Sequence, residues 1–179
     1  FDSSDLYVMN GSVSNFSGDG SSYSFDLTAT GDGPISVGIE SNVASDAAGN
    51  GNDTGAFSIT SDRTDPTATI TVTPSSPTNA SSIEFVVAFD EDVTGLDASD
   101  FSVGNGSISE LTGSGSEYHV WVTPTADGTV SLSLAEDAAH DAAGNGNEAD
   151  SASITSDRTA PTASITSSLS GPTNANSIP

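Results

Sequence analysis

The chain has 179 residues and a formal net charge of -23, because 25 acidic side chains are balanced only by Arg63 and Arg158. Negative charge at this density repels polyanions, so nucleic acid is not expected among the partners. The absence of cysteine excludes a disulfide framework and a thiolate metal site. No apolar run approaches the ~20 residues that span a bilayer, so membrane insertion is not expected either.

The composition favours short strands over helices. Ser, Thr, Gly, Asp, Ala and Val are abundant, whereas Leu is scarce and Lys is absent. Hydrophobic residues make up 34% of the chain, a low share that raises intrinsic disorder as an alternative to a small folded core. The regular alternation of apolar and polar residues argues against disorder and predicts an all-β fold.

Apolar residues recur at every second position in a series of short segments, as half-buried strands require. In chain order these segments are 23–27, 35–39, 57–59, 68–72, 83–89, 101–103, 118–122, 130–134 and 152–154. Turn-forming residues separate them, including Asn105-Gly106 and the stretch from Gly113 to Gly115. We predict a strand at each segment, with the alternating apolar side chains facing inward.

The sequence repeats at a spacing of 95 residues, with Phe1 aligned to Leu96 and about half of the aligned pairs identical. The most similar stretches are DAAGNGN, at 46–52 and 141–147, and SITSDRT, at 58–64 and 153–159. About seven short strands per repeat are typical of an immunoglobulin-type sandwich. We therefore predict a partial sandwich at 1–64 that lacks its first two strands, a complete one at 65–159, and the first strand or strands of a third repeat at 160–179.

The run VTGLDASDF...NGS...DGTVSLSL...DAAGNGN...SITSDRTAPT resembles the bacterial Ig-like domain repeats of large secreted or cell-surface adhesin-type proteins. The resemblance covers the whole chain, and the DAAGN element followed by D-x-T-x-P-T is fairly specific. It implies tandem immunoglobulin-like β-sandwich domains in a surface-exposed stalk, often tuned by calcium. It does not imply any catalytic activity. The disulfide and companion Trp of antibody domains are absent, since Trp121 lies on a later strand, so the similarity to antibodies is architectural.

Acidic and amide side chains cluster in three segments that this fold brings to one pole. In a seven-strand sandwich, the loops after the second and sixth strands lie where the chain enters the domain, beside the SDRT connector. Ca²⁺ needs six to eight oxygen ligands from carboxylates, amides and carbonyls. We therefore predict an interdomain calcium site formed by Asp62, Asp65, Asp90, Glu91, Asp92, Asp141, Asn145 and Asn147. The corresponding positions of neighbouring repeats add Asp46, Asn50 and Asp157 to the candidates.

Two other roles remain open for these residues. Asp and Asn also form turns and caps, because they tolerate left-handed backbone geometry and hydrogen-bond their own loops. Arg63, and Arg158 at the same position of the next connector, would each clamp a neighbouring carboxylate. Crowded carboxylates repel one another unless a cation or Arg63 relieves them, which favours a metal at this pole.

No catalytic site is expected. Zinc is excluded because there is no cysteine and the two histidines, His119 and His140, lack paired-ligand spacing. Ser24 and Ser45 stand at their positions in the first repeat, so no Ser-His-Asp arrangement recurs. Trp121 and His119 have the parity of an outer sheet face, where they are candidates for binding a neighbour or a glycan. A cross-strand pair that shields the sheet is the alternative.

The sequence thus predicts a non-enzymatic spacer, or stalk, of a secreted or cell-surface repeat protein or filament. The expected partners are neighbouring Ig-like repeats or identical subunits, and the alternative function is a carbohydrate- or surface-binding adhesion module that recognises cell-surface glycans. Because 1–64 lacks two strands that 160–179 begins to supply, the tail of one chain could fill the head of the next by strand addition. The alternative is that the chain is a window of a longer continuous array.

Overall fold

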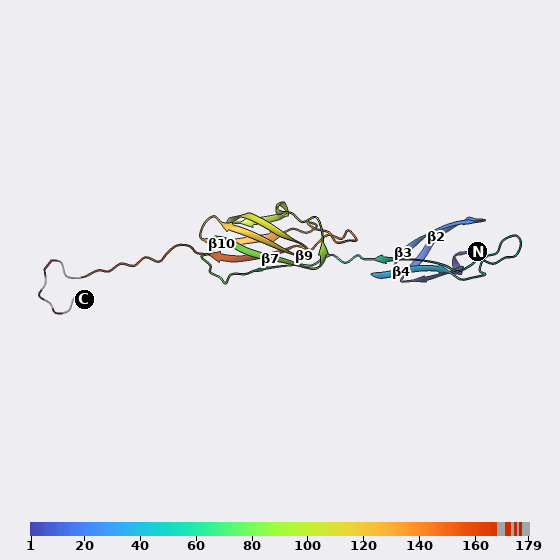
Figure 1. Ribbon diagram of the computed structural model, residues 1–179, viewed down its shortest axis with the longest axis horizontal. Helices are drawn as coiled ribbons and strands as arrows, with labels where there is room; N and C mark the ends of the chain where they lie inside the picture. The colour runs from blue at the N-terminus through green and yellow to red at the C-terminus, as the bar shows by residue number, and fades with distance from the viewer. Residues whose placement is uncertain (168–170, 173, 175, 177–179) are drawn as a thin grey trace.

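The computed structural model describes residues 1–167, 171, 172, 174 and 176, and its regular structure there is β-strand apart from two short 3-10 helices. The first module contains η1 (Ser3–Asp5), β1 (Leu6–Met9), β2 (Gly11–Asp19), β3 (Ser22–Ala29), β4 (Gly33–Ile39) and β5 (Gly55–Ser61). The second module contains β6 (Ala68–Val72), β7 (Ile83–Val93), η2 (Ala98–Asp100), β8 (Phe101–Gly104), β9 (Gly106–Pro124), β10 (Gly128–Leu134) and β11 (Asp150–Ser156). Figure 1 shows the two modules in line, joined by an extended connector. Among the described residues, no helix is long and apolar enough to cross a membrane.

The second module is a sandwich of two antiparallel sheets, with strand orders β6-β7-β9 and β11-β10-β8. β9 folds back on itself as a hairpin. Gly113 and Gly115, near its tip, have positive φ angles of 110° and 69°, and Ser109 Oγ donates to Trp121 O at 3.0 Å across the two arms. The first arm therefore adds a fourth strand to its sheet, which gives the four-plus-three arrangement of an immunoglobulin sandwich.

The core of the second module lies between these sheets. Phe85, Val120 and Leu132 are completely buried there, because alternate residues of a strand point to the same face. The other buried apolar side chains of this core are Ala68, Ile70, Ile83, Val87, Phe89, Val93, Phe101, Tyr118, Val122, Val130, Leu134, Ala139 and Ile154. The predicted all-β, immunoglobulin-like sandwich is confirmed.

The sequence pattern does not predict the first arm of β9, and the first module shows why. There the same arm is β2, and its register with β3 shifts between Ser14 and Ser17. Such a bulge inserts an extra residue on one strand and breaks the alternation on which the prediction depends. Val13 and Phe16 are consequently three residues apart rather than two or four.

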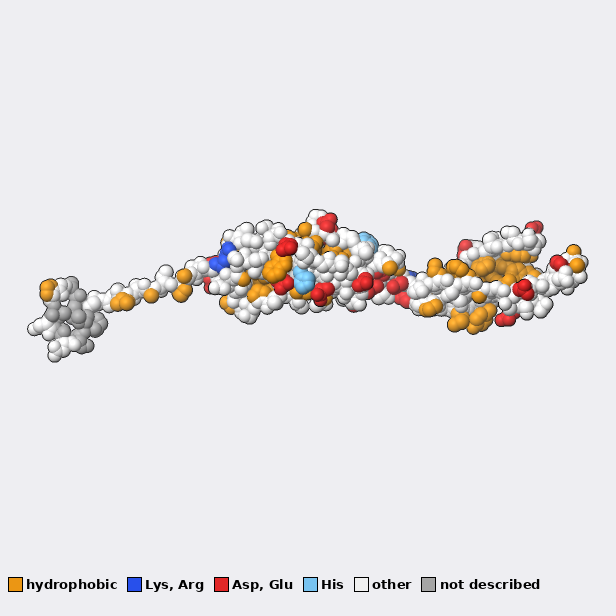
Figure 2. All heavy atoms as spheres, in the orientation of Figure 1, with side chains coloured by type: hydrophobic (Ala, Val, Ile, Leu, Met, Phe, Trp, Pro, Cys, Tyr) orange, Lys and Arg blue, Asp and Glu red, His pale blue; other side chains and the backbone are white. Residues whose placement is uncertain are grey.

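The first module follows the same plan but is open on one side. Its sheets are β1-β4-β5 and β2-β3, and no described strand pairs with β3 where β7 pairs with β9 in the second module. Ile59 of β5 is therefore 55% exposed, whereas Ile154, at the same repeat position in β11, is only 3% exposed. Figure 2 shows hydrophobic side chains at the surface of this module.

Residues 160–167 are exposed and form no strand, although the sequence predicts the first strand of a third repeat here. In the second module the corresponding strand, β6, is held by backbone pairing with β7. Much of the remaining predicted segment, including Ile178 at the expected start of a second strand, lies outside the described residues. The third repeat therefore stays a prediction.

The unequal burial of Ile154 and Ile59 leads to a paired test. We expect Ile154→Ala to lower the free energy of unfolding of the second module by about 2–5 kcal/mol, because it leaves a cavity in a packed core. The matched Ile59→Ala should cost the first module less than about 1 kcal/mol. Chemical denaturation, followed by Trp121 fluorescence for the second module and by NMR for the first, measures both. Equal losses would mean that Ile59 is buried in solution.

Candidate metal site at the domain junction

The loop between β10 and β11 is shaped by the carboxylate of Asp141. Its Oδ1 accepts hydrogen bonds from the backbone N–H groups of Ala143, Gly144 and Asn145 at 2.8, 2.6 and 2.8 Å, and Oδ2 accepts from Asn145 Nδ2 at 2.8 Å. Gly144 takes a φ of 95°, which favours glycine at this turn. The DAAGN motif is thus a loop wound around one buried carboxylate, which is 6% exposed.

Asn147 closes the same loop and uses its whole side chain to do so. Its Oδ1 accepts from the backbone N–H groups of Ala138 and Ala139 at 2.9 and 2.7 Å. Its Nδ2 donates to the carbonyl oxygens of Ala135 and Glu148 at 2.9 and 2.7 Å. Both lone pairs of the amide oxygen are engaged, so the structure gives Asn147 a loop-forming role rather than an orientation toward the carboxylates.

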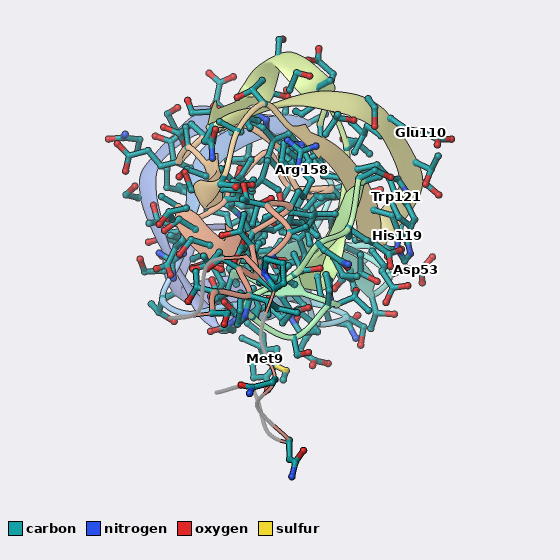
Figure 3. All side chains as sticks on the ribbon, turned by 90° about the vertical axis from the view of Figure 1, so that its left-hand side faces the viewer. Met9, Asp53, Glu110, His119, Trp121 and Arg158 are labelled. Atoms are coloured by element: carbon teal, nitrogen blue, oxygen red, sulfur yellow. The ribbon has the colours of Figure 1, made fainter. Side chains whose placement is uncertain are left out.

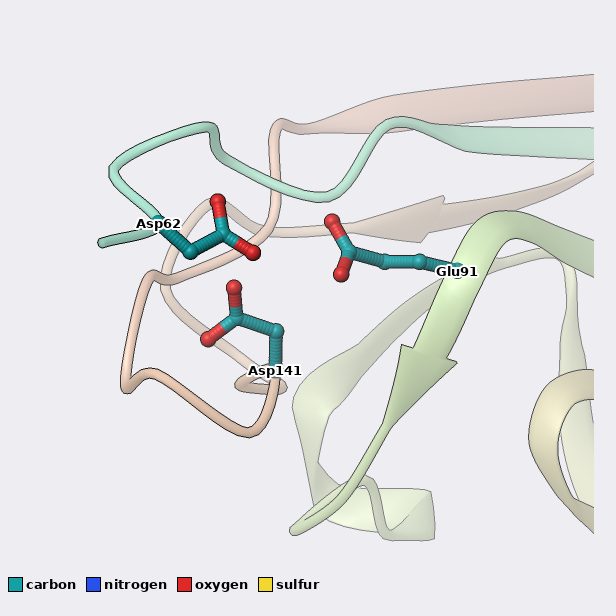
Figure 4. A group of neighbouring side chains, drawn as sticks. All are labelled: Asp62, Glu91 and Asp141. Atoms are coloured by element: carbon teal, nitrogen blue, oxygen red, sulfur yellow. The ribbon is translucent and has the colours of Figure 1, made fainter. Parts of the chain in front are cut away.

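Three carboxylates from separate segments meet beside this loop. Asp62 comes from the connector, Glu91 from the end of β7 and Asp141 from the loop, and one oxygen of each lies within 4.8 Å of the others. Figure 4 shows the three side chains pointing toward a common centre. Asn145 Nδ2 also donates to Asp62 O at 3.2 Å, which fixes the connector against the loop.

The carboxylates of the cluster repel one another when they are ionised. Burial raises the pKa of Glu91, and the nearby charges of Asp141, Asp62 and Asp90 raise it further. For Asp141, burial acts in the same direction, but hydrogen bonds from the Asn145 side chain and from the loop backbone outweigh it and leave the pKa lowered. The pKa of Asp141 is thus lowered and that of Glu91 is raised, so the repulsion disfavours the ionised form of Glu91.

Arg63 follows Asp62 in the chain but does not neutralise the cluster. Its Nε lies 3.3 Å from Asp32 Oδ1, in the loop between β3 and β4 of the first module. Arg158, at the equivalent position, donates through Nη2 to Pro124 O at 3.1 Å. The expected arginine clamp on a carboxylate is thus present for Arg63, through a hydrogen bond from Nε, and the guanidinium of Arg158 binds a carbonyl instead.

The remaining predicted ligands lie around the cluster or away from it. Asp90 Oδ1 accepts from Thr67 N at 2.8 Å, Asp65 is exposed, and the Asp92 carboxylate lies against Gly115 of the β9 hairpin. Asp90, Glu91 and Asp92 belong to β7, which runs to Val93, so they are not loop residues as the sequence suggests.

The candidates from neighbouring repeats have local partners. Asp46 and Asn50 reproduce the wound loop in the first module, where Asn50 N and Nδ2 both donate to Asp46 at 2.9 Å. Asp157 Oδ1 accepts from Thr159 N at 3.2 Å. The structure therefore brings together Asp62, Glu91 and Asp141, with Asp90 and Asn145 adjoining them.

An aspartate outside the predicted metal site forms hydrogen bonds with each connector, and it recurs at the same position in both modules. Asp32 accepts from Thr64 Oγ1 at 2.8 Å as well as from Arg63, and these hydrogen bonds lower its pKa. At the equivalent position, Asp127 accepts from Thr159 Oγ1 and from Arg158 N, with the same effect on its pKa. The sequence signal that could have found them is the Asp-Gly pair that recurs at a spacing of one repeat, 32–33 and 127–128. Both glycines have positive φ angles, 106° and 124°.

Trp121 and His119 lie on the outer face of the sheet, as predicted. Their cross-strand neighbours on β7 are Glu84 and Val86. His119 Nδ1 is 2.9 Å from Glu84 Oε1 and its Nε2 is 3.4 Å from Glu117 Oε1. The hydrogen bond to Glu84 is the main cause of the raised pKa of His119. Figure 3 shows Trp121 and His119 close together on one side of the molecule.

The strand order, the two facing sheets and the wound β10–β11 loop define the class of protein as an immunoglobulin-like sandwich. The sequence profile of the bacterial Ig-like domain family matches residues 62–156, from the connector through β11, and the chain belongs to that family. Domains of this family are typically non-catalytic and usually extracellular or surface-exposed. A search of curated protein sequences found no match.

The raised pKa of Glu91 sets the sign of a pH effect. A carboxyl group whose folded pKa lies above its ordinary value of 4.5 destabilises the fold when ionised, so its penalty is relieved as the pH falls through the folded pKa toward 4.5. We expect Glu91→Gln to stabilise the second module at neutral pH in the presence of chelator and to remove this part of the pH dependence. Denaturation followed by Trp121 fluorescence at several pH values measures it.

The control for this experiment is Glu110→Gln, which removes an exposed carboxylate from the first arm of β9. Its pH profile should follow that of the unaltered chain. If Glu91→Gln also left the profile unchanged, repulsion within the cluster would not affect stability.

Proposed function

We propose that the chain is a non-enzymatic spacer of an extracellular repeat protein or filament, in which Ig-like modules are held end to end at fixed angles. Calcium at the junction between modules stiffens the array, and copies join through strand complementation at the open first module. The partners are neighbouring Ig-like repeats or identical subunits. A spacer needs reach and rigidity rather than a reactive pocket, as quasi-one-dimensional arrays provide.

One observation carries the spacer proposal: the connector is hydrogen-bonded to the modules on both sides. Arg63 and Thr64 bind Asp32 of the first module. On the other side, Asp62 O accepts from Asn145 and Pro66 O accepts from Glu148 N at 2.9 Å. Pro66 is itself buried in the second module. A connector bound at both ends over so few residues leaves little room for the modules to swing.

The calcium part of the proposal rests on the carboxylate cluster. Its oxygen-only donors suit a hard cation, and Asp62, Glu91 and Asp141 would hold it. A bound divalent cation would relieve the repulsion that raises the pKa of Glu91. Because Asp62 belongs to the connector and the other two to the second module, the same ion would tie the connector down more firmly.

Removal of Asp32 tests the rigid junction. We expect Asp32→Ala to release Arg63 and Thr64 and to broaden the distribution of angles between the modules. Small-angle X-ray scattering should then show a smaller average maximum dimension, and NMR relaxation should show the modules tumbling more independently. Asp53→Ala, an exposed carboxylate in the loop before β5, is the control and should leave both unchanged. Identical scattering from the two variants would show that the contacts of Asp32 with Arg63 and Thr64 do not fix the angle between the modules.

Calcium removal tests the metal site. Ligand that binds only the folded state stabilises it by about 2.7 kcal/mol when its free concentration is about 100 times Kd. We therefore expect calcium to raise the melting temperature of the second module and to increase the maximum dimension of the chain, with chelator reversing both.

Variants show whether calcium acts on the melting temperature through the carboxylate cluster or through the overall negative charge of the chain. Asp62→Asn and Glu91→Gln should each abolish the response to calcium, since each removes one of three carboxylates. Asp127→Ala lies at the other end of the second module, where it contacts Arg158 and Thr159, and should keep the response. An unchanged melting temperature of the unaltered chain in excess chelator would exclude the site.

The second candidate function is adhesion to a glycan or surface. It is favoured by the half-buried Trp121 beside His119 and Glu84 on an outer sheet face, since an aromatic ring flanked by polar groups suits a sugar ring. The corresponding residues of the first repeat are Ser24 and Asp26, so only one such face exists in the two repeats compared. Trp121 fluorescence during a glycan titration distinguishes this role from the spacer role.

A further inference from the structure

A histidine on the outer face of the β7–β9 sheet lies between two carboxylates. Nδ1 of His119 is 2.9 Å from Oε1 of Glu84, which belongs to the neighbouring strand β7. Nε2 of the same ring is 3.4 Å from Oε1 of Glu117, on β9 itself. Both ring nitrogens therefore face a carboxylate oxygen.

This geometry suits only one protonation state of the imidazole. A neutral imidazole carries a single N–H, so its other nitrogen would turn a lone pair toward a carboxylate oxygen. The imidazolium ion carries an N–H on each nitrogen, and it can donate to both carboxylates at once. The contacts of His119 with Glu84 and Glu117 are thus complete only when the ring holds two protons.

The two carboxylates are unequal partners of the ring. The side chain of Glu84 is 23% exposed, whereas that of Glu117 is 66% exposed. Because water and salt screen an exposed pair more strongly, the shorter and less exposed contact with Glu84 is the stronger one. The hydrogen bond to Glu84 is accordingly the main cause of the raised pKa of His119, and the contact with Glu117 contributes less.

Glu84 also connects the histidine to the strand on the other side of β7. Its Oε2 accepts a hydrogen bond from Thr73 Oγ1 at 3.2 Å, directly after β6 ends at Val72. Its backbone O accepts from Thr73 N at 3.2 Å. A row of polar contacts therefore crosses the sheet from the end of β6, over β7, to His119 on β9.

No other ionisable group of the adjoining strands contacts the ring. β6 carries no ionisable residue, and the first arm of β9 carries only Glu110. Within the described part of the chain, Glu110 is not among the ion-pair partners of His119. The other carboxylates of β7, those of Asp90, Glu91 and Asp92, lie beyond the shift in its register with β9.

We infer that His119, Glu84 and Glu117 form a proton-dependent clamp, which strengthens the pairing of β7 with β9 when the imidazole is doubly protonated and loses this effect when the ring is neutral. The clamp belongs to the second module alone, because Ser24 and Ser22 stand at the repeat positions of His119 and Glu117. Neither calcium nor the way in which modules are joined enters this inference.

The clamp also changes the charge of the surface around Trp121. Trp121 is the cross-strand neighbour of Glu84, on the same outer face as His119. When His119 loses its second ring proton, the two carboxylates lose their positive partner and this face becomes more negative. A partner that binds beside Trp121 would therefore meet a different charge on the two sides of the transition.

The direction of the pKa shift sets the sign of the effect on stability. A histidine whose folded pKa lies above its ordinary value of 6.5 contributes stability that is fully present below pH 6.5 and is lost as the pH rises through the folded pKa. We therefore expect the unaltered chain to melt at a higher temperature than His119→Gln below pH 6.5, with a difference that shrinks above the folded pKa. Glu91 is present in both chains, so its own pH dependence cancels from this difference.

An NMR titration of the imidazole tests the clamp directly. The chain has two histidines, so His140→Gln leaves only the ring signals of His119. We expect a titration midpoint above 6.5, with both ring nitrogens protonated below it. In this background Glu84→Gln should lower the midpoint and Glu117→Gln should lower it less. Glu110→Gln is the matched control and should leave the midpoint unchanged.

A midpoint at or below 6.5, or one that Glu84→Gln does not lower, would overturn the inference. So would a difference in melting temperature between the unaltered chain and His119→Gln that is the same at every pH, since packing of the ring rather than its charge would then explain it. If His119→Gln failed to fold, the NMR midpoints alone would decide, because they are measured on chains that keep the ring.

Discussion

The pairing of β7 with strands on both of its sides is the constraint on which the second module depends. Along its first half, β7 joins β6 to β9 and places Ile83, Phe85 and Val87 in the core, all without solvent exposure. Beyond Ala88 its register with β9 shifts, and the strand continues to Val93 while presenting Glu91 to the connector. One strand therefore both closes the sandwich and brings a carboxylate to the junction. In the first module, where no described strand takes this place, Phe57 and Ile59 of β5 are exposed.

The residues of β7 that stabilise the core lie in its first half, and the carboxylates near the junction lie at its end. The buried half carries no ionisable inward side chain, so hydrophobic burial there is independent of pH and metal. The end at the junction holds Asp90, Glu91 and Asp92 in sequence, close to Asp62 and Asp141. Repulsion at this end can change with protonation or a bound cation without disturbing the core. The carboxylates of the junction are thus kept apart from the apolar core.

Much of this arrangement could be predicted from the sequence, and the failures have physical causes. Alternation of apolar residues identifies β6, β7, β10 and β11, because each is a regular strand with one buried face. It misses the first arm of β9, since a bulge of the kind seen in β2 breaks the period of two. Of the residues predicted for the metal site, Asp62, Glu91 and Asp141 lie together. The inward turn of Asn147 and the pairing of Arg63 with Asp32 could not be predicted, because each depends on side-chain geometry within a loop.

The hydrogen bonds that hold the connector to the end of a module recur in both modules, and this recurrence bears on the shape of an array of modules. Asp32 and Asp127 occupy the same position in their modules and accept hydrogen bonds from the same Arg-Thr pair of the following connector. Each connector therefore leaves its module in a similar direction. If each also meets the next module through a loop like that of Asp141, every junction repeats one rotation and one translation, and a chain of identical steps is a regular rod or helix. If the cluster of Asp62, Glu91 and Asp141 also recurs at each junction, a change in stiffness at every junction adds up along the length of the array.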